Sequence, residues 1–222
     1  MRHFDKDIEQ LKELLLRMGA MVEDSINDSI RALLERDTAL AERVMASDAE
    51  IDAMELEIDQ HTVELIAKMQ PAAVDLRFVT TAMKITPELE RIADLAVDVC
   101  ERAVELNREP SLKPLIDIPR LARITQEMVR QSLDAFVRRD ATLARDVICR
   151  DDEVDLLTEQ SFRELLTYML EDSRNISRAI RLTFVGKYFE RMADAATNIC
   201  EMVVYLAEGT VIKHQHPNEP PH

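Results

Sequence analysis

The chain has 222 residues, enough for one large domain or two domains of about 100 residues each. It contains 3 Gly, no Trp and 4% aromatic residues, a composition typical of long helices rather than sheets. The formal net charge of -15 opposes binding to nucleic-acid phosphates and to anionic membranes. We therefore expect no nucleic-acid partner, and contact with a membrane only through partner proteins.

Targeting and redox features predict a cytoplasmic protein. The sequence from Met1 to Asp5 leads into charged helical sequence without the apolar core of a signal peptide. No apolar stretch approaches the roughly 18 residues of a membrane span. Three cysteines, Cys100, Cys149 and Cys200, lack metal-finger spacing and are expected to be reduced thiols.

The first half predicts three helices. Apolar residues recur every three or four positions from about residue 5 to residue 35, which indicates a first helix. Asp37 would cap a second helix, and Pro71 would end it. A third helix is expected over about 75–107. Pro87 could begin a fresh helix there, but we favour one long helix with a kink near that proline.

The second half repeats this plan after a proline cluster formed by Pro110, Pro114 and Pro119. Asp140 would cap its second helix, and its last helix would end near Glu208, before Gly209. We predict a first domain over 1–108, a linker over 109–119, a second domain over 120–209 and a disordered tail over 210–222. The tail contains His214, His216 and His222, which could contact a metal, although disorder is favoured.

An internal duplication relates the two halves. Glu90–Glu101 reads ERIADLAVDVCE and Glu190–Glu201 reads ERMADAATNICE, with seven of twelve positions identical. Residues 36–52 and 139–155 match at eight of seventeen positions. Duplicated helical patterns joined by short turns predict an all-α fold of six long helices, arranged as two tandem three-helix bundles.

The duplicated segment also carries a stripe of oxygen ligands within one helical sector of roughly 80°. The stripe consists of Glu90, Asp94, Asp98 and Glu101 in the first copy and of Glu190, Asp194, Asn198 and Glu201 in the second. Carboxylates at such spacing repel one another unless a cation lies among them. Hard oxygen donors suit a divalent or trivalent metal, whereas the alternative is a solvated acidic face.

Counting back from turns near residues 72 and 172 gives weaker metal candidates on the preceding helices. Asp52 and Asp48 would lie level with the first stripe, and Asp151 and Asp155 level with the second. We find no Ser/His/Asp or Cys/His constellation, no glycine-rich phosphate loop and no HExxH motif. We therefore expect that the protein is not an enzyme.

The twin motifs, with Asp75, Leu76 and Arg77 preceding the first copy, resemble the PhoU family over about residues 5–208. The resemblance implies two three-helix bundles with pseudo-twofold symmetry. It also implies metal sites, because the signature carboxylates bind iron or zinc clusters in some members and magnesium or manganese in others. If the metal ligands of the family are transferred to the matching positions of this sequence, Glu90, Asp94 and Asp98 would bind metal at one site. Glu190, Asp194 and Asn198 would bind it at the other. The neutral Asn198 would weaken the second site.

The resemblance further implies a negative regulator of phosphate uptake and of the phosphate-starvation two-component response. Such a protein would be a metal-binding adaptor between the cytoplasmic side of the phosphate ABC transporter and a sensor histidine kinase, and a homodimer. Three alternatives remain. A ferritin-like carboxylate enzyme is disfavoured because no ExxH motif lies on a helix core. A metal-free helical scaffold and the related accessory protein of low-affinity phosphate permeases are the other two.

Overall fold

The computed structural model of the chain describes residues 3–69, 71 and 73–212, and these residues form helices joined by turns, without strands. The helices are His3–Leu34 (α1), Thr38–Met69 (α2), Ala73–Leu106 (α3), Asp117–Arg138 (α4), Ala141–Cys149 (α5), Asp151–Glu171 (α6) and Ile176–Glu208 (α7), with a short 3-10 helix at Ser173–Asn175 (η1). The predicted all-α class is confirmed. The tail histidines lie outside the described residues.

The middle helix of the second half is divided at Arg150, so the six predicted helices form seven segments. Arg150 keeps helical torsions, φ -79 and ψ -14. Its backbone N–H donates to the Val147 carbonyl at 3.0 Å, the tighter bonding of a 3-10 turn. Its guanidinium donates to Gln131 and Glu127 of α4 at 3.0 and 2.8 Å. This tight turn in α5–α6 has no equivalent in α2.

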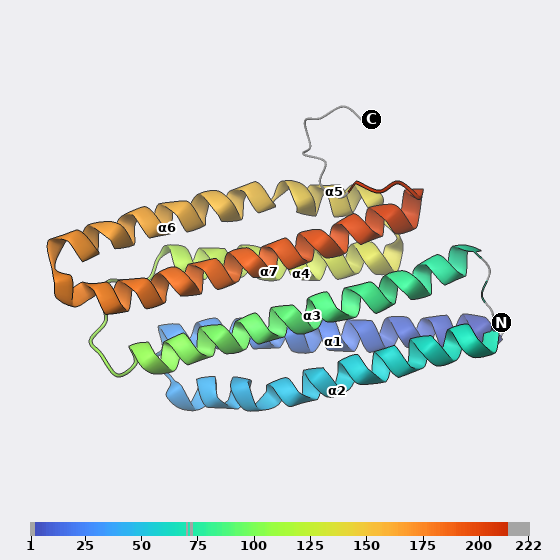
Figure 1. Ribbon diagram of the computed structural model, residues 1–222, viewed down its shortest axis with the longest axis horizontal. Helices are drawn as coiled ribbons and strands as arrows, with labels where there is room; N and C mark the ends of the chain where they lie inside the picture. The colour runs from blue at the N-terminus through green and yellow to red at the C-terminus, as the bar shows by residue number, and fades with distance from the viewer. Residues whose placement is uncertain (1–2, 70, 72, 213–222) are drawn as a thin grey trace.

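The helices form two layers (Figure 1). In the front layer α2, α3, α7 and α6 lie side by side, and α1 and α4 lie behind them. The two repeats therefore meet along α3 with α7 and along α1 with α4. One continuous hydrophobic core contains residues of both repeats. Near one end of this core, close to the start of α3 and the end of α4, the buried rings of Phe78 and Phe136 stack with centroids 4.7 Å apart.

The contact between α1 and α4 depends on a glycine. A Cβ atom at Gly19 would overlap the Cδ1 atom of Leu133, a buried residue of α4. The missing side chain lets the two helix backbones approach closely, so this position helps to fix how the repeats pack.

The helix boundaries follow the local signals. Asp37 Oδ1 accepts a hydrogen bond from the Leu40 backbone N–H at 2.9 Å. Asp140 Oδ1 caps α5 in the same manner, with two bonds of 3.0 Å. Helix α3 continues through Pro87 as one helix. Helix α7 ends at Glu208, and Gly209 adopts φ 76, a left-handed conformation that favours glycine.

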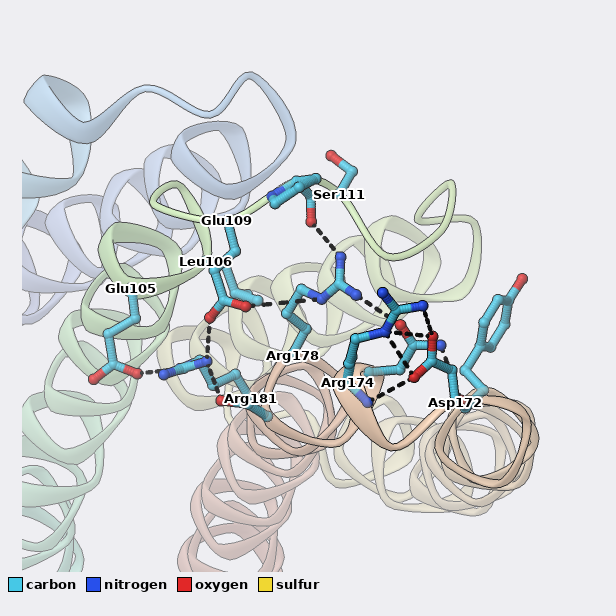
Figure 2. A network of polar contacts seen from close by, with 12 residues as sticks. Glu105, Leu106, Glu109, Ser111, Asp172, Arg174, Arg178 and Arg181 are labelled. Carbon is cyan, nitrogen blue, oxygen red and sulfur yellow. Dashed lines mark hydrogen bonds and ion pairs between the residues drawn. The ribbon is translucent and has the colours of Figure 1, made fainter.

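A polar network ties the start of α7 to the end of α3 and to the segment that follows it (Figure 2). Arg181 donates to Glu105 at 2.8 Å and to Glu109 at 2.9 Å. Arg178 donates to the Pro110 carbonyl at 2.9 Å. Because these bonds join residues of both repeats, the network holds the repeats in one orientation.

Candidate functional site

The first acidic cluster lies on the seam between α2 and α3. Two helical spacings create it: Asp48, Asp52 and Glu55 recur every three or four residues in α2, and Glu90 and Asp94 do so in α3. The helices are neighbours, and the charges of the α2 carboxylates act on Glu90 of α3, so the two sets of carboxylates face each other. We call these five residues the first acidic cluster.

Burial and mutual repulsion shape the protonation of this cluster. Burial, followed by the charges of Asp94, Glu55, Asp52 and Asp48, raises the pKa of Glu90 to about 7. Burial and the same neighbours, Asp52 and Asp94, also raise the pKa of Asp48. The α2 carboxylates therefore interact electrostatically with those of α3, as expected of a site that needs a cation.

The second acidic cluster lies on the seam between α6 and α7 and consists of Asp151, Asp155, Glu190 and Asp194. Burial, followed by the charges of Asp194 and Asp155, raises the pKa of Asp151 to about 7. The Oδ1 atom of Asp151 is buried and has no hydrogen-bond partner. A buried carboxylate oxygen without a donor is costly, which makes this atom a strong candidate for binding a cation.

The two clusters differ in one positively charged side chain. Lys187 donates to Glu190 at 2.5 Å in the second cluster, and its charge offsets part of the rise that burial, Glu190 and Asp194 cause in the pKa of Asp155. The equivalent position in the first repeat is Pro87, one hundred residues earlier. The first cluster thus lacks this lysine.

Asp98 and Asn198 lie apart from the α2 and α6 carboxylates and face the opposite repeat. Asn198 donates to Glu88 of α3 at 3.4 Å. The pKa of Asp98 is raised by burial and by Glu101, and lowered by the charge of Arg191 in α7. Asn198 therefore lines a groove between α3 and α7, and Asp98 lies near Arg191 of α7, although Asp94 still raises the pKa of Asp98.

Arginines of the twin motifs act across the interface between the repeats. Arg91 of the first copy lowers the pKa of Asp194, which burial and Glu190 raise. Arg191 of the second copy lowers the pKa of Asp98. In this crossed arrangement each arginine interacts electrostatically with a carboxylate of the other repeat. The sequence alone did not reveal this role.

Sequence reasoning also missed Glu55. Burial and the charges of Asp59, Asp52 and Asp94 raise its pKa, which places it in the first acidic cluster. The signal was available, because Asp48, Asp52, Glu55 and Asp59 follow one helical spacing of three and four residues.

The side chains, as they lie, do not form a finished metal site. Among the described residues, no three His, Cys, Asp or Glu side chains are arranged to hold a metal ion. The donor set nevertheless fits one, because it consists of oxygen atoms on facing helices. The pKa values of Glu90 and Asp151 are raised to about 7, and one buried oxygen of Asp151 has no partner. The cysteines are free thiols and lie outside the clusters.

No helix within the described ranges combines the length and the apolar character needed to cross a bilayer.

Comparison with known proteins agrees with this architecture. The family model described as PhoU domain matches residues 15–103 and 118–203. The phosphate-specific transport system accessory protein PhoU homolog of Aquifex aeolicus is 43% identical over 96% of this chain and 97% of its own length. Its counterpart from Escherichia coli K12 is 37% identical over 95% of this chain and 88% of its own length.

The crystal structure of PhoU from Pseudomonas aeruginosa superposes with a TM-score of 0.89 at 40% identity, covering 94% of this chain and 100% of that one. The phosphate transport system regulatory protein PhoU from Streptococcus pneumoniae gives a TM-score of 0.87 at 24% identity, over 94% and 99% of the two chains, which supports the fold. The domain matches twice and the relatives span nearly the whole chain. The chain therefore belongs to the PhoU family.

Proposed function

We propose that this protein is a negative regulator of phosphate uptake and of the phosphate-starvation response. Relatives that are 37% and 43% identical carry the name of an accessory protein of phosphate-specific transport. The observation that carries the proposal from the structure is the pair of acidic clusters on equivalent seams of the two repeats. Their location suits a regulated contact surface, and no catalytic step is assigned to them.

The clusters would hold divalent or trivalent metal ions, such as iron, zinc, magnesium or manganese. Asp48, Asp52, Glu90 and Asp94 would supply the ligands of the first site, with Glu55 beside them. Asp151, Asp155, Glu190 and Asp194 would supply those of the second. Asp98 and Asn198 are the least suited of the expected ligands because they face the opposite repeat.

The chemistry that a metal would supply here is charge neutralisation. In a chain of net charge -15, the repelling carboxylates oppose the approach of any acidic surface. Neutralised clusters would let this face dock on the cytoplasmic side of the phosphate ABC transporter and on a sensor histidine kinase. The protein would then act in the cytoplasm as an adaptor, as a homodimer.

A deletion experiment tests the regulatory role. Loss of the gene should give constitutive expression of phosphate-starvation genes in phosphate-rich medium, and the wild-type chain should restore repression. An Asp94→Ala plus Asp194→Ala variant should restore it poorly and should carry less metal by elemental analysis. Normal repression in the deletion strain would reject the regulatory proposal.

Two measurements separate the alternative functions. A ferroxidase assay on iron-loaded protein tests the carboxylate enzyme, for which turnover would be required. Elemental analysis of protein purified without chelator tests the metal-free scaffold. Wild-type repression by the double variant, with unchanged metal content, would remove the clusters from the mechanism.

A further inference from the structure

The seam between α6 and α7 continues from the second acidic cluster into an apolar stretch. Its exposed hydrophobic side chains recur at every fourth residue on both helices, and each is between 41% and 80% exposed. They are Phe162, Leu166 and Leu170 of α6, and Ile176, Ile180 and Phe184 of α7. We call these six residues the apolar seam.

A groove of about 220 Å³ joins the acidic and apolar parts of this surface. Its lining includes Asp155, Phe162, Lys187 and Glu190, so Phe162 of α6 lies across the seam from Lys187 of α7. The helices run antiparallel, and each further turn of α6 therefore meets an earlier turn of α7. Because Gly186 lies opposite Thr158 by the same register, Phe162 lies about level with Phe184.

The apolar seam also has an aromatic pair at its edge toward α3, where burial and the charge of Asp98 raise the pKa of Tyr188. The rings of Phe184 and Tyr188 stack one turn apart on α7, with centroids 6.3 Å from each other. An aromatic side chain already held by a neighbour loses little conformational freedom when a partner binds.

The first repeat provides an internal comparison. The repeats align with offsets of 103 residues between α2 and α6 and 100 residues between α3 and α7, as the duplicated segments show. At the six equivalent positions the first repeat has Asp59, Val63, Ala67, Leu76, Thr80 and Lys84. A duplicated hairpin thus folds with polar or small residues at four of these positions, so folding alone does not require the apolar seam.

We propose that the apolar seam binds an amphipathic helix of a partner protein, with Lys or Arg residues at the end that reaches the second acidic cluster. Two antiparallel helices with large side chains at every fourth position form a surface that accepts a third helix. Charge complementarity sets its orientation, because Asp151, Asp155 and Asp194 lie at one end of the seam. This inference rests on the proposed docking function and adds a basic partner, which the metal-free second acidic cluster attracts, to the acidic surfaces that dock when metal neutralises the clusters.

Other occupants fit less well. An anionic membrane surface is repelled by a chain of net charge -15. A second copy of this chain would bring a further set of like charges toward the second acidic cluster if it docked on the same face. A helix with a basic end is not repelled by the net negative charge and brings no further acidic groups toward the second acidic cluster.

The test uses a fluorescein-labelled peptide of Leu and Lys, about five turns long and patterned as an amphipathic helix with Lys gathered at one end. Binding is followed by fluorescence anisotropy in EDTA, beside a scrambled peptide of equal composition. The variant Phe162→Asp, Ile180→Thr, Phe184→Lys carries the residues of the first repeat and keeps the net charge. The matched control is Val63→Asp, Leu76→Lys, which removes two exposed apolar side chains from the first repeat.

We expect the triple variant to bind the patterned peptide on the order of tenfold more weakly than wild type, and the control variant to bind within about twofold. The scrambled peptide should bind weakly to all three proteins. Circular dichroism and thermal melts check the fold. The single Phe162→Asp variant should also bind the patterned peptide more weakly than wild type does.

Several outcomes would overturn the proposal. These are equal affinity of the triple variant and wild type, an equal loss in the control variant, or tight binding of the scrambled peptide. If wild type is a dimer and the triple variant is a monomer, the surface would be assigned to a second copy of this chain. If wild type sediments with phosphatidylglycerol vesicles and the triple variant does not, the surface would be assigned to a membrane. None of these results affects the deletion phenotype, so a failure here leaves the regulatory proposal standing.

Discussion

Lys187 donates a hydrogen bond to Glu190 at 2.5 Å, and this lysine stands where the first repeat has Pro87. The side chain of Glu190 is 22% exposed, so the pair is partly shielded from solvent. The duplicated clusters are therefore unequal in charge. The second one carries its own positive charge, which competes with any external cation.

Removing Lys187 should strengthen metal binding at the second acidic cluster. In a background of Asp52→Asn plus Asp94→Asn, which disables the first site, Lys187→Met should raise the affinity for Mn²⁺ by about twofold to fivefold, the effect of one partly exposed ion pair. Isothermal titration calorimetry measures it. Lys84→Met, an equal charge change one turn before Pro87, is the control and should leave the affinity unchanged. A weaker affinity in Lys187→Met would show that this lysine helps to organise the site.

Stability should fall as pH rises from about 4 to about 7. The folded pKa of Glu90 is raised to about 7, above its ordinary value of 4.5, so the folded state holds this proton more tightly than the unfolded chain does. The stabilisation is complete below the unfolded pKa and is lost as pH passes the folded one. Asp151 should behave in the same way from its ordinary value of 3.8.

Urea denaturation in EDTA at pH 4 and pH 8 measures this dependence. Glu90→Gln should gain about 1–2 kcal/mol over wild type at pH 8, after allowance for solvent screening, and little at pH 4, because glutamine resembles the protonated acid. Glu42→Gln, on an α2 residue outside the cluster, is the control. A destabilised Glu90→Gln protein at pH 8 would contradict the prediction.

Metal removal should matter at high pH and hardly at low pH. Ligand carboxylates must be deprotonated, and Glu90 and Asp151 lose their protons near pH 7. At pH 8 and a metal concentration of about 100 times Kd, we expect a bound ion to add about 2.7 kcal/mol to the free energy of unfolding, all of it removed by EDTA. Thermal melts with and without EDTA at pH 5 and pH 8 test this. An EDTA effect of equal size at both pH values would place the metal elsewhere.

Two glycine substitutions should have opposite signs. Gly19→Ala introduces a methyl group against buried Leu133, and the overpacking should cost about 1–3 kcal/mol. Gly186→Ala meets only Thr158 Cγ2 at 3.9 Å, an ordinary contact, and should gain about 0.5–1 kcal/mol from helix propensity. Urea denaturation of both variants gives the comparison. Equal effects would mean that α1 and α4 pack less closely than described here.

The shared core predicts a single unfolding transition. Phe78 of the first repeat stacks on Phe136 of the second, and both are completely buried. Phe78→Ala should therefore destabilise the whole protein by about 3–5 kcal/mol, with one transition rather than two. Differential scanning calorimetry distinguishes the outcomes, and Phe162→Ala at the exposed apolar seam is the control. A second, unshifted transition would show that the repeats unfold independently.

The sequence by itself determined the duplication, most of the helix boundaries and most of the candidate ligands of each helix. Local chemistry decides these features: Asp37 and Asp140 cap helices through backbone N–H groups a few residues away, and Gly209 adopts the left-handed torsion that ends α7. The stripe of carboxylates likewise follows from helical spacing alone. Such signals act within one or two turns and can be read along the chain.

The tertiary structure decided which ligands meet, because helix rotation and the packing of the repeats are set by contacts distant in sequence. Helical spacing placed Asp98 in line with Glu90, yet packing of α3 against α7 turns it toward Arg191. The same packing brings Arg91 near Asp194, and the facing of α2 and α3 adds Glu55 to the first acidic cluster. These relationships depend on side chains such as Phe78 in the shared core, so a helical pattern read along the chain could not reveal them.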